Sequence, residues 1–145
     1  MKVKVTPSKV HGNVKIPASK SMAHRALICA SLSDGTSIVS NVTNSKDIEA
    51  TVGCMKALGA NIKQINETTY EVTGTNLFKQ EGNITCNANE SGSTLRFLIP
   101  LAACTNAKVK FLGQGRLLQR PMDVYKNEFK EQNIEFNQSN QEIIV

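Results

Sequence analysis

The order of the expected elements repeats along the chain, and this repetition constrains the fold more than any other feature of the sequence. A helix pattern that opens near Ser21 is followed by a strand, a second helix and a hairpin, and a similar order follows a helix start at Ser93. Aligning these two serines also aligns Asn61 with Asn133, an offset of about 72 residues. Few residues match between the halves, so the predicted internal duplication rests on the order of elements.

Short strands and helices are predicted for the first half of the chain. Residues 3–5 and 13–16 are expected strands, and Pro17 restricts the residue before it to an extended conformation. From Ser19 onward apolar residues recur at helical spacing, which predicts core contacts for four side chains: Met22, Leu27, Ile28 and Leu32. The other expected elements are a strand at 36–40, a helix capped at 44–45, and a hairpin with strands at 62–65 and 70–72.

The second half contains a helix that opens at 92–94 and a strand at 108–112. Pro121 suits the first position of a further helix, and strands at 133–136 and 142–145 form the expected terminal hairpin. Since a final apolar strand normally needs cover on its outer face, we expect a truncated chain whose edge at 143–145 could pair with a second copy. The alternation of helices and strands predicts an α/β (α+β) fold.

The chain of 145 residues fits one ordinary domain and carries a net charge of +5, from 17 Lys and Arg against 12 Asp and Glu. The positive charge favours anionic partners, but no Trp, two Tyr and five Phe give no stacking cluster for nucleic acid. Small phosphorylated metabolites account for the charge with fewer residues. No segment has the apolar length of a membrane span or a signal peptide, so we expect a cytoplasmic protein.

The first basic helix start contains Lys20 and Ser21, and Arg25 follows one turn later on the same face. A helix N-terminus presents free backbone N–H groups and a partial positive charge, so this arrangement suits a phosphate or a carboxylate. The alternative is an ordinary serine cap with exposed basic residues.

Two further basic segments precede helices. Gly92 permits close approach of a ligand to the backbone, and Arg96 follows it by four residues. In the third segment, Arg116 and Arg120 stand before Pro121, and each guanidinium can bind an anion through two hydrogen bonds. Capping residues and a solvated loop are the alternatives, but three such segments at similar places favour an anion site.

The histidines and acidic residues give weaker signals. His11 lies in an expected turn, and His24 faces away from the best-placed ligand groups, so surface or packing roles are expected for both. Asp47 could approach a basic site, but a place in the first turn of a helix is the stronger explanation. Four widely spaced cysteines without a CxxC pair predict free thiols rather than a metal site.

Three motifs together resemble the 5-enolpyruvylshikimate-3-phosphate synthase family. They are residues 19–25 (SKSMAHR), residues 90–96 (ESGSTLR) and residues 119–122 (QRPM), in the family order. The resemblance implies repeated βαβαββ units of the enolpyruvyl transferase fold, here an incomplete inside-out α/β barrel. Residues 1–18 would be strands that pack with a missing C-terminal lobe, and residues 19–145 one lobe with repeats at about 19–74 and 91–145.

The resemblance also implies an activity: transfer of the enolpyruvyl group from phosphoenolpyruvate to the 5-hydroxyl of shikimate 3-phosphate, in chorismate and aromatic amino-acid biosynthesis. Lys20 would be catalytic and contact both substrates, and Ser21 and Arg25 would bind shikimate 3-phosphate. Gly92, Arg96 and Arg120 would bind phosphoenolpyruvate: these are residues of the matching motifs. No metal or organic cofactor is implied, and the full-length enzyme is expected to be a monomer without nucleic-acid or membrane partners.

The chain differs from that family in two respects, and two alternative functions remain. Members of that family are much longer, so this chain alone is expected to bind substrate without turnover. Glu90 stands where many members carry asparagine, and its carboxylate could weaken anion binding or pair with a nearby arginine. The related transferase for UDP-N-acetylglucosamine normally has a cysteine before the arginine-proline motif, where this chain has Leu117, Leu118 and Gln119. A non-catalytic module that binds anions or nucleic acid is the alternative from a different class.

Overall fold

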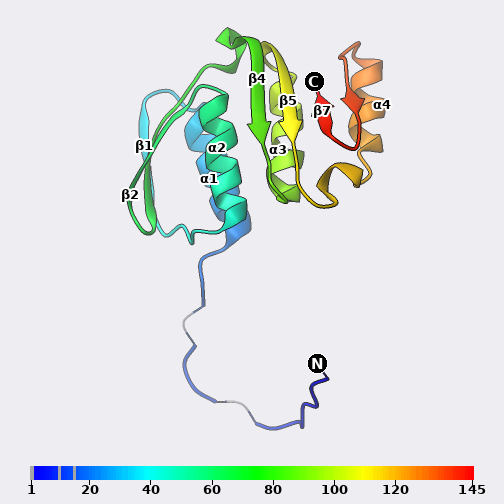
Figure 1. Ribbon diagram of the computed structural model, residues 1–145. Coiled ribbons are helices and arrows are strands. Elements are labelled where there is room, and N and C mark those ends of the chain that lie inside the picture. The colour runs from blue at the N-terminus through cyan, green and yellow to red at the C-terminus, as the bar shows by residue number, and fades with distance from the viewer. Residues whose placement is uncertain (1, 10, 15) are drawn as a thin grey trace.

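The computed structural model describes residues 2–9, 11–14 and 16–145, in which two β-sheets enclose and flank a group of helices (Figure 1). In chain order the elements are α1 (Lys20–Leu32), β1 (Thr36–Val39), α2 (Lys46–Ala57), β2 (Asn61–Asn66), β3 (Thr69–Thr73), η1 (Leu77–Lys79), β4 (Glu81–Asn87), α3 (Gly92–Ala102), β5 (Asn106–Leu112), η2 (Leu117–Gln119), α4 (Asp123–Glu131), β6 (Asn137–Gln138) and β7 (Glu142–Ile144). Over the ranges that are described, no helix combines the length and apolarity that crossing a membrane requires.

The first sheet has the strand order β1-β3-β2, and β3 pairs antiparallel with both neighbours. Tyr70 and Val72 on β3 are buried while the residues between and beside them are partly exposed, as expected for a sheet with one face on the core. Helix α1 packs against β1 and β3. Strand β1 is left at an edge of this sheet.

The second sheet has the order β4-β5-β7-β6. Strands β4 and β5 run parallel, and α3 makes the crossover between them. Strand β7 lies inside the sheet, paired antiparallel with β5 and β6, and Ile143 on it is fully buried. The expected open edge at 143–145 is therefore wrong, because both sides of β7 already have backbone partners.

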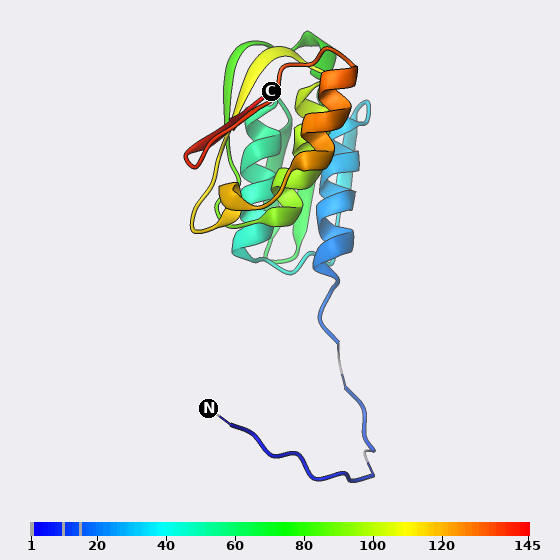
Figure 2. The same ribbon diagram turned by 90° about the vertical axis from the view of Figure 1, so that its right-hand side faces the viewer.

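Helices α1, α2 and α3 pack against one another, and α2 also contacts β2 and β4 of the two sheets. The core between them contains Leu27 of α1, Met55 of α2, Leu98 of α3 and Phe111 of β5, all fully buried. In both views the helices run in the same direction, so their N-termini lie at one end of the molecule (Figures 1 and 2). This common direction decides where the functional residues meet.

Two of the four expected core contacts of α1 are wrong. Leu27 and Ile28 are buried, but Met22 is 64% exposed and Leu32 is 37% exposed. Helical spacing identifies an apolar stripe, but it does not say whether a neighbour covers the whole stripe. Met22 lies on the part of α1 beside the end of β1, where a shallow groove remains open.

The segment before α1 forms no strand in its described residues, the expected strand at 3–5 included, and the packing of residues 1–18 with a C-terminal lobe stays a prediction. The strand expected at 13–16 includes Lys15, which lies outside the described residues, and its other members form no strand. Figure 1 shows this segment leading away from the sheets and helices. Apolar alternation supplies the side chains of a strand, but a strand also needs backbone partners.

One strand and two boundaries in the second half also differ from expectation. Strand β4 was not predicted, because it has few apolar residues and is held through its backbone by β5. Pro121 stands two residues before α4 rather than at its first position, and the first strand of the last hairpin is at Asn137–Gln138 instead of 133–136.

Candidate functional site

The starts of α1, α2 and α3 meet at one end of the molecule. Lys20 Nζ of α1 lies 3.5 Å from Asp47 Oδ2 of α2, and the Thr94 hydroxyl of α3 lies 3.3 Å from the Asp47 carbonyl oxygen. Each helix start presents N–H groups without helical partners and the positive end of its dipole. Three such ends together create a region that attracts anions.

At the start of α1, Ser19 caps the helix by accepting a hydrogen bond from the Met22 amide over 3.4 Å. Lys20 is the first helical residue, and its side chain is 55% exposed despite the contact with Asp47. Ser21 follows and is also exposed. The ammonium, the hydroxyl and the free amides are therefore accessible to an anionic ligand.

Arg25 connects the start of α1 with α3. Its Nη1 donates to the backbone oxygen of Ser21 over 2.8 Å, and its Cζ lies 4.8 Å from the ring centroid of Phe97 on α3. The aromatic ring and the carbonyl hold the guanidinium in place. Arg25 thus adds a fixed positive charge to this helix start.

At the start of α3, Gly92 leaves room for two guanidinium groups. Arg120 Nη1 occupies the space that a side chain at Gly92 would need. Arg96 Nη1 lies 3.3 Å from the position that a Cβ would take at Gly92. Ser91 caps the helix and is buried. Free amides and two planar cations at one point suit a carboxylate or a phosphate.

Glu90 lies beside this second cluster. Its Oε1 is 2.5 Å from the position that a Cβ would take at Gly115, so the carboxylate is directed at the loop between β5 and η2. In the described part of the chain, ion pairs join Lys20 to Asp47 and Lys110 to Glu142, and Glu90 belongs to neither. The expected alternative of pairing with a nearby arginine is not found.

The described surface has hollows beside the helix starts and elsewhere. One of about 450 Å³ lies beside the starts of α2 and α3, and its lining is Lys46, Asp47, Glu49, Asn89, Glu90 and Gln114. A larger one, of about 700 Å³, lies by η2, α4 and β6, and neither hollow is lined by any of the six predicted site residues. Size alone therefore does not identify the site, and the converging helix starts are the better guide.

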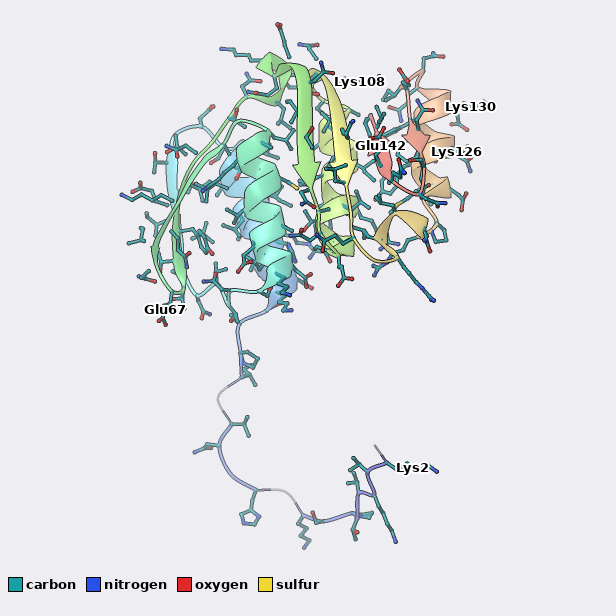
Figure 3. The ribbon with its side chains drawn as sticks, in the orientation of Figure 1. Lys2, Glu67, Lys108, Lys126, Lys130 and Glu142 are labelled. Carbon is teal, nitrogen blue, oxygen red and sulfur yellow. The ribbon has the colours of Figure 1, made fainter. Side chains whose placement is uncertain are left out.

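Other basic residues are spread over the molecule. Figure 3 shows Lys108 and Lys130 toward the end opposite the helix starts, and Lys126 on the outer side of α4. These three lysines therefore lie away from the helix starts and are not part of the candidate anion site. Among the residues that are described, no three potential metal ligands gather into a cluster.

His24 is one of the buried polar residues between these helices. It is 3% exposed, and its Nδ1 lies 2.7 Å from the Thr51 hydroxyl. Burial lowers the pKa of His24, Asp47 raises it, and Lys20 and Arg25 lower it further. The expected packing role of His24 is confirmed. Its partner Thr51, a polar residue at apolar spacing on α2, was not predicted.

The structure places the six predicted site residues in two groups at the same end. Lys20, Ser21 and Arg25 lie on the first turns of α1, and Gly92, Arg96 and Arg120 surround the start of α3. Contacts through Asp47 and Phe97 connect the groups. Their roles toward particular ligands remain predictions.

This chain is similar to known proteins in sequence and in fold. Residues 4–145 match the profile of the family described as EPSP synthase (3-phosphoshikimate 1-carboxyvinyltransferase). A 3-phosphoshikimate 1-carboxyvinyltransferase of Clostridium perfringens (strain SM101 / Type A) is 51% identical over 136 residues, which are 94% of this chain and 32% of that relative. The enzyme of the same name from Clostridioides difficile (strain 630) is 45% identical over 146 residues, 93% of this chain and 33% of the relative.

A solved structure of EPSP synthase from Acinetobacter baumannii is similar in fold. Its TM-score is 0.79 at 17% sequence identity, and the match covers 92% of this chain and 32% of that one. The predicted α/β class with the enolpyruvyl transferase fold is confirmed by this likeness. The chain spans about a third of the length of the relatives that it matches.

Proposed function

Since this chain belongs to the EPSP synthase (3-phosphoshikimate 1-carboxyvinyltransferase) family, we propose that it supplies the anion-binding helix starts for enolpyruvyl transfer. The complete protein would move the enolpyruvyl group of phosphoenolpyruvate to the 5-hydroxyl of shikimate 3-phosphate and release phosphate. The observation that supports this most directly is Gly92 at the start of α3 with the guanidiniums of Arg96 and Arg120 beside it.

The start of α1 is the proposed site for shikimate 3-phosphate. Lys20, Ser21 and Arg25 supply an ammonium, a hydroxyl and a guanidinium within the first turns of one helix. A phosphate group carries about two negative charges and accepts several hydrogen bonds, so it matches these donors and the free amides of the helix. Asp47 must give up part of its contact with Lys20 when the phosphate binds.

The start of α3 is the proposed site for phosphoenolpyruvate. Arg120 and Arg96 provide two planar cations, and Gly92 lets the ligand reach the first amides of the helix. Phosphoenolpyruvate has a carboxylate and a phosphate, so both cations find a partner. Lys20 would lie between the two ligands and stabilise the negative charge that they bring together.

The chemistry needs more than charge. The 5-hydroxyl must lose a proton and the methylene carbon of phosphoenolpyruvate must gain one, which requires acid and base groups at those atoms. Among the predicted site residues, Lys20 is the one that we propose to be catalytic. We expect this chain alone to bind the ligands without turnover, because it spans about a third of its relatives.

An NMR titration of the isotopically labelled chain tests this proposal. Shikimate 3-phosphate is added first and phosphoenolpyruvate second, with UDP-N-acetylglucosamine as the rival ligand. Saturable shifts at Lys20, Ser21 and Arg25 are expected with the first ligand and at Gly92 with the second. Lys20→Met should weaken the first shifts, and Lys56→Met, which alters the far end of α2, should leave them unchanged.

The outcomes separate the readings. Preferential binding of the UDP-sugar would replace the proposed substrate, and binding of DNA or RNA with a steep salt dependence would indicate a nucleic-acid module. A well-folded sample that responds to neither substrate would contradict the proposal for this chain. Release of phosphate by the purified chain would contradict the expected lack of turnover.

The wider setting follows from the proposed activity. We propose a cytoplasmic enzyme of chorismate and aromatic amino-acid biosynthesis that works as a monomer without a metal or an organic cofactor. Sedimentation of the complete protein tests the monomeric state. Activity after treatment with a chelator tests whether the enzyme works without a metal.

A further inference from the structure

A buried chain of hydrogen bonds connects α1, α2 and α3 beneath the two helix starts. His24 Nδ1 of α1 lies 2.7 Å from Thr51 Oγ1 of α2, which lies 2.7 Å from Thr94 Oγ1 of α3. Thr94 Oγ1 lies 2.7 Å from Ser91 Oγ, the cap of α3, and 3.3 Å from the Asp47 carbonyl oxygen. The four side chains in this network are at most 3% exposed.

The available protons give this network a direction. Thr94 has one hydroxyl proton, which it donates toward Ser91 or toward the Asp47 carbonyl, an oxygen that can only accept. Thr51 then donates to Thr94, and the Thr51 oxygen accepts from the Nδ1–H group of His24. His24 is therefore the donor at the start of the network, and the cap of α3 is at its end.

The same imidazole also contacts the first helix start. The His24 ring packs edge-on against Phe97 with 6.5 Å between centroids, and Phe97 holds the Arg25 guanidinium. His24 thus contacts the supports of both clusters, although it is not exposed to a ligand itself.

We propose that His24 is a positioning residue for the anion site at the start of α3, acting through Thr51 and Thr94 on the Ser91 cap. Gly92 directly follows Ser91, so a shift of the cap moves the first amide of α3 relative to the Arg120 guanidinium. This inference rests on the proposed function for its ligand, phosphoenolpyruvate, but the position of the cap is a property of the free protein.

Two matched pairs of variants test the role. Thr51→Val keeps the shape and removes the hydroxyl, whereas Thr51→Ser restores a hydroxyl. His24→Leu removes the donor, whereas His24→Asn keeps an N–H close to the position of Nδ1. The amide shifts of Gly92 and Ser93 are recorded without ligand, and phosphoenolpyruvate is then titrated into each folded variant.

Thr51→Val and His24→Leu should move both amide signals and weaken phosphoenolpyruvate binding about fivefold, because a buried partner is lost from the network. Thr51→Ser and His24→Asn should return the two amide signals toward their positions in the unaltered chain. They should also return the affinity for phosphoenolpyruvate to within about twofold of that chain. The use of two positions keeps the test valid if one variant fails to fold.

Lower melting temperatures with unchanged amide signals and unchanged affinity would overturn the proposal, since the network would then only stabilise the fold. If the unaltered chain binds no phosphoenolpyruvate, the proposed function fails, and the amide signals alone decide the positioning role. Movement in Thr51→Val that Thr51→Ser reverses supports the role, and its absence overturns it.

Discussion

The starts of α1 and α3 carry similar residues but differ in how the chain leads into them. Strand β4 precedes α3 and is paired along its whole length with β5, and the Ser91 cap is buried. No strand precedes α1 in the described residues, and Ser19 is exposed. The second start is therefore fixed from both sides, whereas the first is fixed from the helix side alone.

The two sheets show the same difference. Strand β5 has β4 as a parallel neighbour, whereas β1 is an edge strand whose described neighbour is β3. A parallel strand beside β1 would give α1 the support that β4 gives α3. We therefore expect the proposed phosphoenolpyruvate site at the start of α3 to be preformed and the proposed shikimate 3-phosphate site at the start of α1 to depend on further contacts.

Replacing the two caps should have the largest and most unequal effect. Ser91→Ala removes the partner of the Thr94 amide and of the buried Thr94 hydroxyl, so we expect a loss of about 2 kcal/mol in the free energy of unfolding. Ser19→Ala at the exposed cap should cost about 0.5 kcal/mol. Urea denaturation of both variants measures the two losses of stability. Equal losses would contradict the inferred difference between the two helix starts.

Removal of one guanidinium at the start of α3 should affect ligand binding at that helix start more than at the start of α1. Arg120→Ala is expected to weaken phosphoenolpyruvate binding about twentyfold, because a charge-assisted hydrogen-bond pair is lost. Shikimate 3-phosphate binding at α1 should change by less than about twofold. Arg116→Ala, in the same loop but without a contact at Gly92, is the control for calorimetric titration. A similar loss of affinity in Arg116→Ala would mean that the net positive charge, and not the contact at Gly92, determines binding.

The pH dependence of stability tests the contact between the two starts. Burial lowers the pKa of folded His24 from its ordinary value of 6.5, so below that value the unfolded chain binds more protons than the folded chain. The free energy of unfolding should therefore fall as the pH drops through 6.5, by at most about 1.4 kcal/mol per pH unit for one group. Above that pH this histidine should contribute no slope.

Urea denaturation at pH 8 and pH 5.5 measures this dependence. His24→Asn should reduce the difference between the two values, and His11→Asn in the exposed segment should retain it. The charges that act on His24 come from Lys20 and Arg25 on its own helix and Asp47 on α2. An unchanged slope in His24→Asn would contradict the assignment.

Much of the fold could be predicted from the sequence because several elements carry their own signals. The helices at 20–32, 46–57 and 92–102 have a serine cap and apolar residues at helical spacing. Strand β4 could not be predicted, since pairing with β5 determines it more than its own side chains do. Met22 shows the opposite case, in which a correct helical pattern predicts burial that no described neighbour provides.

The candidate site divides in the same way. Basic residues near glycine and serine caps indicated Lys20, Arg25 and Gly92, because the local sequence defines a helix start. The contact between Arg120 and Gly92 and the network through Thr51 join residues that are far apart in the chain. Such contacts depend on packing of whole elements, so local patterns do not contain them.

The smallest expected effect concerns the ion pair at the open helix start. Asp47→Asn removes the carboxylate beside Lys20, and because the pair is exposed we expect the free energy of unfolding to change by less than about 0.5 kcal/mol. Shikimate 3-phosphate should then bind about twofold more tightly at low salt, since a competing negative charge is gone. Phosphoenolpyruvate binding at α3 should change less.

Glu49→Gln is the matched control for this change. Glu49 is the other acidic residue in the first turn of α2, but it makes no ion pair with Lys20. Both variants lose one negative charge at the same helix start, so a difference between them isolates the contact with Lys20. A destabilisation above about 1 kcal/mol in Asp47→Asn alone would mean that the pair holds the start of α1 in place. The first helix start would then be as fixed as the second, and the contrast between them would lose its physical basis.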